Sequence, residues 1–135
     1  MLLKSLPPPL PRSFGRRRGK KLRPGRLSLV ETLLPRLSIA LPATGEGDLD
    51  PIALFGSRPR AVWLEIGFGS GEHLAAQAAA NPDVGIIGCE VFVNGVASLL
   101  RHVEEDGLAN VRLYADDARA LLAALPDRCL ERVFL

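Results

Sequence analysis

Glycines and carboxylates gather in the stretch Glu65–His73, which reads EIGFGSGEH. Gly67, Gly69 and Gly71 alternate there, and glycines let a backbone turn sharply and approach a ligand closely. The apolar run AVWL precedes this stretch and the alanine-rich run EHLAAQAAA ends it. The loop therefore connects a strand to a helix, as nucleotide-binding loops do. A dinucleotide fingerprint, G-x-G-x-x-G, would need glycine where this sequence has Glu72, and a carboxylate at a helix N-terminus disfavours a pyrophosphate.

Carboxylates also follow three successive predicted strands. Glu65 lies at the end of the first, Glu90 comes 25 residues later at the end of the second, and Asp116 and Asp117 follow the third. In nucleotide-binding sheets an acid about 20 residues after the loop accepts hydrogen bonds from ribose hydroxyls. An acid after the third strand can accept from an adenine amino group, and Glu65 can attract a cation. S-adenosylmethionine has these groups and no phosphate, so the pattern predicts an S-adenosylmethionine site more strongly than a dinucleotide site.

The elements that position these acids alternate along the chain. Short apolar runs predict buried strands at 61–66, 84–91, 110–115 and 131–135. Helices are predicted at 72–80, from an Asn94 cap to a Gly107 cap, and at 117–125. This βαβ alternation predicts an α/β fold with a parallel sheet, in which ligands bind at the carboxyl ends of the strands.

The first 30 residues carry nine Lys and Arg and no acid, whereas the other residues carry eight and fifteen, respectively. Residues 1–26 are rich in Pro and Arg, and we expect them to be disordered or extended when unbound. Residues 27–37 predict a helical turn broken near Pro35. The basic arm predicts binding to a polyanion, with a merely solvated tail as the alternative. Its candidate polyanion-binding residues are Arg12, Arg16, Arg17, Arg18, Lys20 and Lys21, with Arg23 and Arg26 adding charge.

Composition argues against several other classes of protein. Cys89 and Cys129 are too far apart for a disulfide framework or a paired-cysteine metal site, and His73 and His102 share no metal-ligand spacing. We therefore expect no metal. No apolar stretch approaches the roughly 20 residues of a membrane span. The sequence indicates a cytoplasmic protein that does not use a membrane.

Four segments carry a family resemblance: RSFGRRRGK (12–20), LEIGFGSGEHL (64–74), GCEVFVNGVASLL (88–100) and GLANVRLYADDARALL (107–122). Together they resemble the tRNA (guanine-N(7)-)-methyltransferase family of bacteria. The resemblance implies a Rossmann-like fold, S-adenosylmethionine as cofactor, and tRNA as the partner of the basic arm. It also implies formation of 7-methylguanosine in the variable loop of tRNA. The cofactor-binding residues that it implies are Glu65, Gly67, Gly69, Gly71, Glu90 and Asp117; Asp117 is preferred over Asp116 because it precedes Ala118.

The family places a segment resembling PDPWPK just after the fourth strand, and this sequence stops at Leu135. The resemblance therefore implies an incomplete chain with a sheet truncated in its fourth strand, no catalytic residue of its own, and little activity by itself. We expect an arm and connector at residues 1–56 and the first half of a methyltransferase domain at 57–135. Two alternatives stay open: a truncated RNA-binding module without catalysis, and another S-adenosylmethionine-dependent methyltransferase that acts on a small molecule. The oligomeric state is left open.

Overall fold

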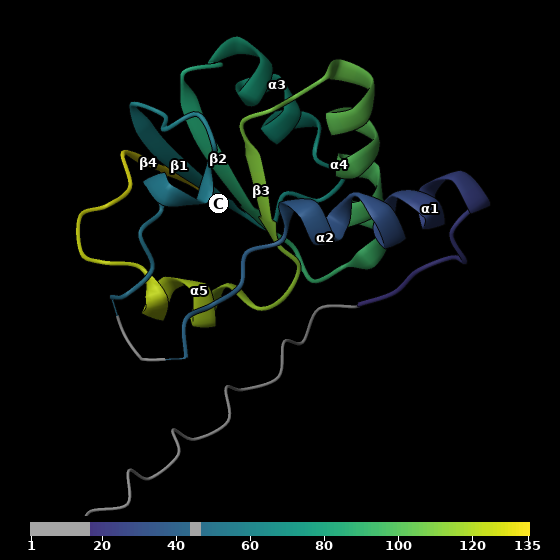
Figure 1. The fold of residues 1–135 in the computed structure, drawn as a ribbon. Coiled ribbons are helices and arrows are strands. Elements are labelled where there is room, and N and C mark those ends of the chain that lie inside the picture. The colour runs from purple at the N-terminus through teal and green to yellow at the C-terminus, as the bar shows by residue number, and fades with distance from the viewer. Residues whose placement is uncertain (1–16, 44–46) are drawn as a thin grey trace, which may run out of the picture.

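A computed structural model describes residues 17–43 and 47–135 of the chain (Figure 1). The helices and strands follow in chain order: α1 (Pro24–Thr32), α2 (Leu34–Leu37), a 3-10 turn (Ile52–Leu54), β1 (Ala61–Ile66), α3 (Glu72–Ala80), β2 (Val84–Cys89), α4 (Val93–Asp106), β3 (Val111–Tyr114), α5 (Ala118–Ala124) and β4 (Arg132–Phe134).

The four strands form one parallel sheet in the order β3-β2-β1-β4. This confirms the predicted alternation and the parallel sheet of a Rossmann-like methyltransferase fold. The carboxyl ends of the strands meet at one edge, where Glu65 lies opposite Gly88 of β2 and Phe134 of β4. Any ligand held by residues that follow these strands must lie along this edge.

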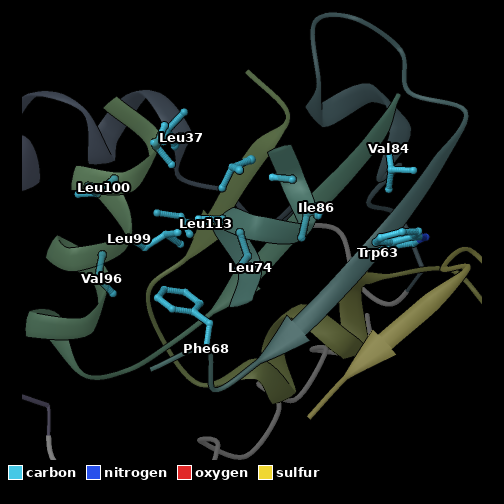
Figure 2. Close-up of a cluster of buried hydrophobic side chains, with 14 residues drawn as sticks. Leu37, Trp63, Phe68, Leu74, Val84, Ile86, Val96, Leu99, Leu100 and Leu113 are labelled. Carbon is cyan, nitrogen blue, oxygen red and sulfur yellow. The ribbon is translucent and has the colours of Figure 1, made fainter. Parts of the chain in front are cut away.

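Helices cover both faces of the sheet. Figure 2 shows Leu99 of α4 beside Leu113 of β3, and Val96, Leu100 and Ile86 belong to the same buried cluster. Trp63 of β1 belongs to the same cluster and is buried. On the opposite face, the sheet packs against α5 and the connector, through a second cluster of Ile39, Leu49, Phe55, Val62, Leu64, Ile87, Cys89, Leu121, Ala124 and Leu125. Because side chains alternate along a strand, each buried strand supplies both clusters.

The limits of the helices follow the predicted signals in most places. Helix α3 spans the predicted residues 72–80, and Gly107 is the C-cap of α4 with a φ of 61°. The predicted N-cap at Asn94 is wrong: α4 begins at Val93, and Phe92 is the N-cap. The Asn94 side chain bonds instead to the N-terminal arm, accepting from Gly19 N at 2.7 Å and donating to Lys20 O at 2.7 Å.

The described part of the basic arm is attached to α4. Besides the two Asn94 bonds, the Arg17 carbonyl accepts from Val93 N at 2.7 Å. Residues 17–23 form neither a helix nor a strand, whereas Pro24 begins α1, so the expectation of a disordered or extended arm is wrong for residues 24–26. Helix α1 then runs beside α4 (Figure 1). The predicted turn at 27–37 is two helices, and the break comes just before Pro35, whose ring nitrogen cannot donate to the preceding turn.

The connector is part of the folded body. Leu37, Ile39, Leu49 and Phe55 are buried in the two clusters, and Ile39 N donates to Leu113 O beside β3. The division of the chain at residue 56 stays a prediction. Within residues 17–43 and 47–135, no helix is long and apolar enough to cross a membrane.

Candidate functional site

The glycine loop after β1 needs glycine for two different reasons. Gly67, Gly69 and Gly71 all have left-handed φ angles, of 70°, 61° and 84°. A Cβ on Gly71, the N-cap of α3, would lie 2.7 Å from Leu99 Cβ, so this glycine lets α3 pack on α4. A Cβ on Gly67 or Gly69 would meet nothing within 4 Å. The first two glycines therefore leave the backbone open to a ligand.

Glu90 fastens this loop to the end of β2. Its Oε1 accepts from Gly69 N at 2.9 Å, while Oε2 accepts from Val91 N at 2.8 Å and Phe92 N at 3.1 Å. These bonds end β2 at Cys89, two residues earlier than predicted. Because a carboxylate can accept about four hydrogen bonds, Glu90 keeps capacity for a ligand hydroxyl.

Asp116 and Asp117 have different partners although they are adjacent. Asp117 is the N-cap of α5, accepting from Arg119 N at 2.9 Å, and it forms an ion pair with the Arg119 guanidinium. The hydrogen bonds from Arg119 hold the pKa of the Asp117 carboxyl well below its usual range. Asp116 accepts from Asp117 N at 2.7 Å and from the Arg17 guanidinium at 3.1 Å. Of the two acids, Asp117 caps the helix and Asp116 contacts the arm.

A pocket of about 360 Å³ opens at the carboxyl edge beside α5. It brings together three of the predicted cofactor-binding residues, Gly67, Glu90 and Asp117, and its volume suits a small ligand. Its full lining is Ile66, Gly67, Cys89, Glu90, Val91, Asp116, Asp117, Ala118, Arg119 and Leu122. Apolar side chains thus form much of its wall, and carboxylates stand among them.

Glu65, Gly69 and Gly71 do not line this pocket. Glu65 has the same strand parity as Trp63, which packs on the α3 and α4 face, so its side chain lies on the face opposite α5. There it is buried and contacts His73 Nδ1. The predicted residues are therefore divided between the two faces, with the glycine loop between them.

The basic residues of the arm lie close to the same edge. Arg17, Arg18, Lys20 and Lys21 are exposed, and Arg17 reaches Asp116 across the start of α4. A second hollow of about 440 Å³ separates the arm from α1 and α4, and Arg18, Lys20 and Lys21 line it. Two further candidates, Arg12 and Arg16, lie outside the described residues.

Cysteine and metal chemistry has little support in the described part of the chain. Cys89 and Cys129 are both free thiols. Burial raises the pKa of Cys89 to about 12, so this thiol stays protonated near neutral pH. No group of three or more His, Cys, Asp or Glu is arranged to hold a metal ion among residues 17–43 and 47–135.

Three contacts at this edge were not predicted: His73 with Glu65, Arg17 with Asp116, and Asn94 with the arm. Two of them join residues that are more than 70 positions apart, and no local pattern marks them. The third joins residues eight positions apart across the glycine loop, and it depends on the way that loop turns.

Comparison with known proteins agrees with this geometry. The sequence model of a family described as "Putative methyltransferase" matches residues 59–135. The tRNA (guanine-N(7)-)-methyltransferase of Paramagnetospirillum magneticum is 57% identical over 126 residues, which cover 93% of this chain and 52% of that protein. Proteins of the same name from Rhodospirillum rubrum and Caulobacter vibrioides are 53% and 52% identical, covering 92% of this chain and 49% and 52% of their own lengths.

The chain spans about half the length of the curated relatives it matches. The resemblance drawn from the four motifs is confirmed, since the relatives bear the name of the family that those motifs indicated. The family match covers more than half of the chain and contains the glycine loop, Glu90 and Asp117. The chain therefore belongs to the methyltransferase family whose sequence model matches residues 59–135.

Proposed function

We propose that the protein carrying this sequence transfers a methyl group from S-adenosylmethionine to N7 of guanine in tRNA. The observation that carries the proposal is the pocket that unites Gly67 with Glu90 and Asp117 at the carboxyl edge. The names of its relatives support guanine in tRNA as the methyl acceptor.

The residues at this edge fit S-adenosylmethionine better than they fit a dinucleotide. The cofactor has no phosphate, and Glu72 places a carboxylate in the first turn of α3, where the pyrophosphate of a dinucleotide would bind. Glu90 and Asp117 are acceptors suited to ribose hydroxyls and an adenine amino group. Ile66, Val91 and Leu122 give the apolar surface that a purine needs.

When bound, S-adenosylmethionine supplies an electrophilic methyl group on its sulfonium. Guanine N7 has a lone pair and no proton, so the acceptor requires no general base. The protein must hold donor and acceptor in line, an effect that contributes about 7–11 kcal/mol in well-oriented reactions. Within this chain, the glycine loop and the strand-end acids would bind and orient the donor.

The basic arm would supply affinity for tRNA. Arg17, Arg18, Lys20 and Lys21 are exposed on the arm, which is attached at the start of α4 close to the pocket. Phosphate contacts by such residues make binding fall steeply with salt. We place the reaction in the cytoplasm, where free thiols such as Cys89 and Cys129 persist.

Deletion of the gene tests this function. Nucleoside analysis of bulk tRNA should show that 7-methylguanosine is lost while other methylated nucleosides are kept, and a plasmid copy of the gene should restore it. Unchanged 7-methylguanosine in the deletion strain would overturn the proposal. If the purified chain binds tRNA but not S-adenosylmethionine, the alternative of an RNA-binding module without catalysis gains support instead.

A further inference from the structure

We propose that His73 is a positioning residue that fixes the Glu65 carboxylate so that it can face the cationic methionine end of the cofactor. This inference rests on the proposed function for the identity of the ligand. It assigns a role to a side chain that is not among the predicted cofactor-binding residues and does not line the pocket at the α5 face.

Glu65 is a buried acid with one polar neighbour. Its side chain is 8% exposed, and among residues 17–43 and 47–135 its one hydrogen-bonding partner is His73 Nδ1. A buried carboxylate without such a partner would be costly, so the contact determines which way the acid points. Glu65 lies two residues before Gly67, the glycine that opens onto the pocket.

The fold itself brings His73 to Glu65. The left-handed turn at Gly67–Gly71 reverses the chain, and α3 begins at Glu72, so His73 in the first turn returns to the end of β1. The imidazole is held from its other side by Phe134, with ring centroids 5.0 Å apart and planes at 73°. Phe134 pairs with Glu65 in the sheet register, so all three side chains meet at the carboxyl edge of β1 and β4.

An imidazole suits this position better than a fixed cation. A neutral His73 with its proton on Nδ1 donates to the carboxylate and leaves the negative charge of Glu65 uncancelled. An Arg or Lys at the same place would neutralise that charge. The low exposure of Glu65 strengthens its attraction for a ligand cation, because little water screens it. Histidine therefore orients the acid and preserves its charge for the ligand.

Titration with two different ligands distinguishes this role from a general effect of the substitution on folding. We would titrate the chain calorimetrically with S-adenosylmethionine and with adenosine, which lacks the methionine end. His73→Leu should weaken S-adenosylmethionine about tenfold through loss of a hydrogen bond to a charged group, and leave adenosine unchanged. His73→Asn keeps an N–H donor and should stay within about threefold of the original affinity. His102→Leu, in α4, is the matched control and should change neither affinity.

Equal affinity of the original chain and His73→Leu for S-adenosylmethionine would overturn the proposal, as would an equal loss for both ligands. If the original chain binds no S-adenosylmethionine at all, the proposed function fails and this inference fails with it, which is a distinct outcome. Should His73→Leu not fold, imidazole ¹⁵N spectra of the original chain decide. A neutral ring with its proton on Nδ1 supports the proposal, whereas a ring protonated only on Nε2, or on both nitrogens, overturns it.

Discussion

Glu90 accepts hydrogen bonds from three backbone N–H groups on two segments of the candidate site, the glycine loop and the turn after β2. The sequence indicates Glu90 as a strand-end acid, and its position on the pocket agrees with that. What the sequence could not predict is that the same carboxylate holds Gly69, since this bond depends on how the loop turns after β1. One residue therefore couples the shape of the loop to the site of the ligand.

Replacing Glu90 by alanine tests this coupling. Loss of the carboxylate leaves three N–H groups without an acceptor, so Glu90→Ala should lower the free energy of unfolding by about 1–3 kcal/mol. Urea denaturation of the original and variant chains measures the difference. Glu104→Ala, which truncates an exposed acid near the end of α4, should change the midpoint little. A midpoint for Glu90→Ala equal to that of the control would contradict the coupling.

The two thiols should differ in reactivity. Cys89 is 1% exposed and its pKa is raised to about 12, whereas Cys129 is partly exposed. Because thiolates are the reactive species, native chain at pH 8 should label at Cys129, and Cys89 should label only after unfolding. Mass spectrometry of the alkylated peptides measures this order. Rapid labelling of Cys89 in the native state would show that the end of β2 is open.

At the scale of elements, the contact between the glycine loop and α4 determines where the loop lies at the candidate site. A Cβ on Gly95 would lie 2.1 Å from Gly69 O, a distance that no rotamer can relieve, so the loop rests on the first turn of α4. Helix α3 could be predicted to the residue because Gly71 and Asn81-Pro82 punctuate it locally. The start of α4 could not, because the Asn94 side chain serves the distant arm instead of its own helix.

Gly95→Ala should displace the loop. Because the obstacle is backbone rather than a flexible side chain, we expect about 1–3 kcal/mol of destabilisation and weaker binding of S-adenosylmethionine. Gly56→Ala is a matched control, since a Cβ there meets nothing within 4 Å. Thermal melts and calorimetric titration of both variants give the comparison. If Gly95→Ala and Gly56→Ala gave the same melting temperature and the same affinity, the close approach of Gly95 to Gly69 would matter neither for stability nor for binding.

Charged side chains connect the start of edge strand β4 to β1, and their contribution to stability should depend on pH. Glu131 accepts from Trp63 Nε1 and from Arg60, and Arg60 also binds Asp83 at 2.6 Å. These contacts lower the pKa of Glu131, chiefly through Trp63, and that of Asp83, chiefly through Arg60. A carboxyl with a lowered folded pKa stabilises the fold above its unfolded value of about 4, and the contribution is lost as pH falls through the folded pKa.

Asp83→Asn combined with Glu131→Gln should therefore lose less stability on acidification than the original chain does. Urea midpoints at pH 7 and pH 3 provide the measurement. The difference in midpoint between the original chain and the double variant should be smaller at pH 3 than at pH 7. Glu104→Gln serves as the reference for loss of an exposed carboxyl. A gap that stays constant across this range would rule out the contribution of these two carboxyls.

At the scale of the whole molecule, the chain divides into an acidic body with a basic arm attached near the carboxyl edge of the sheet. Composition alone indicates the division of charge, since nine of the 17 Lys and Arg lie in the first 30 residues. The place of attachment could not be predicted, because it depends on hydrogen bonds between the backbone of residues 17–20 and both Val93 N and the side chain of Asn94. This attachment puts the exposed Arg and Lys of the arm near the pocket at the carboxyl edge.

Removing the arm's charge should weaken tRNA binding and lower its salt dependence. Each phosphate contact contributes close to one unit to the slope of log affinity against log salt, so Arg18→Gln/Lys20→Gln/Lys21→Gln should lower that slope by about two to three. Arg36→Gln/Arg58→Gln/Arg128→Gln removes the same charge from exposed sites elsewhere. Filter binding of bulk tRNA at several salt concentrations measures both slopes. Equal slopes for the two triple variants would contradict a specific role for the arm.

The claim on which the whole account depends is that the pocket beside α5 takes S-adenosylmethionine. Calorimetric titration of the chain with S-adenosylmethionine, and separately with a nicotinamide dinucleotide, tests it most directly. The arrangement of Gly67, Glu90 and Asp117 predicts that S-adenosylmethionine binds one molecule per chain and that the dinucleotide gives no measurable heat at the same concentration. Binding of the dinucleotide in its place, or no heat with S-adenosylmethionine, would contradict the account.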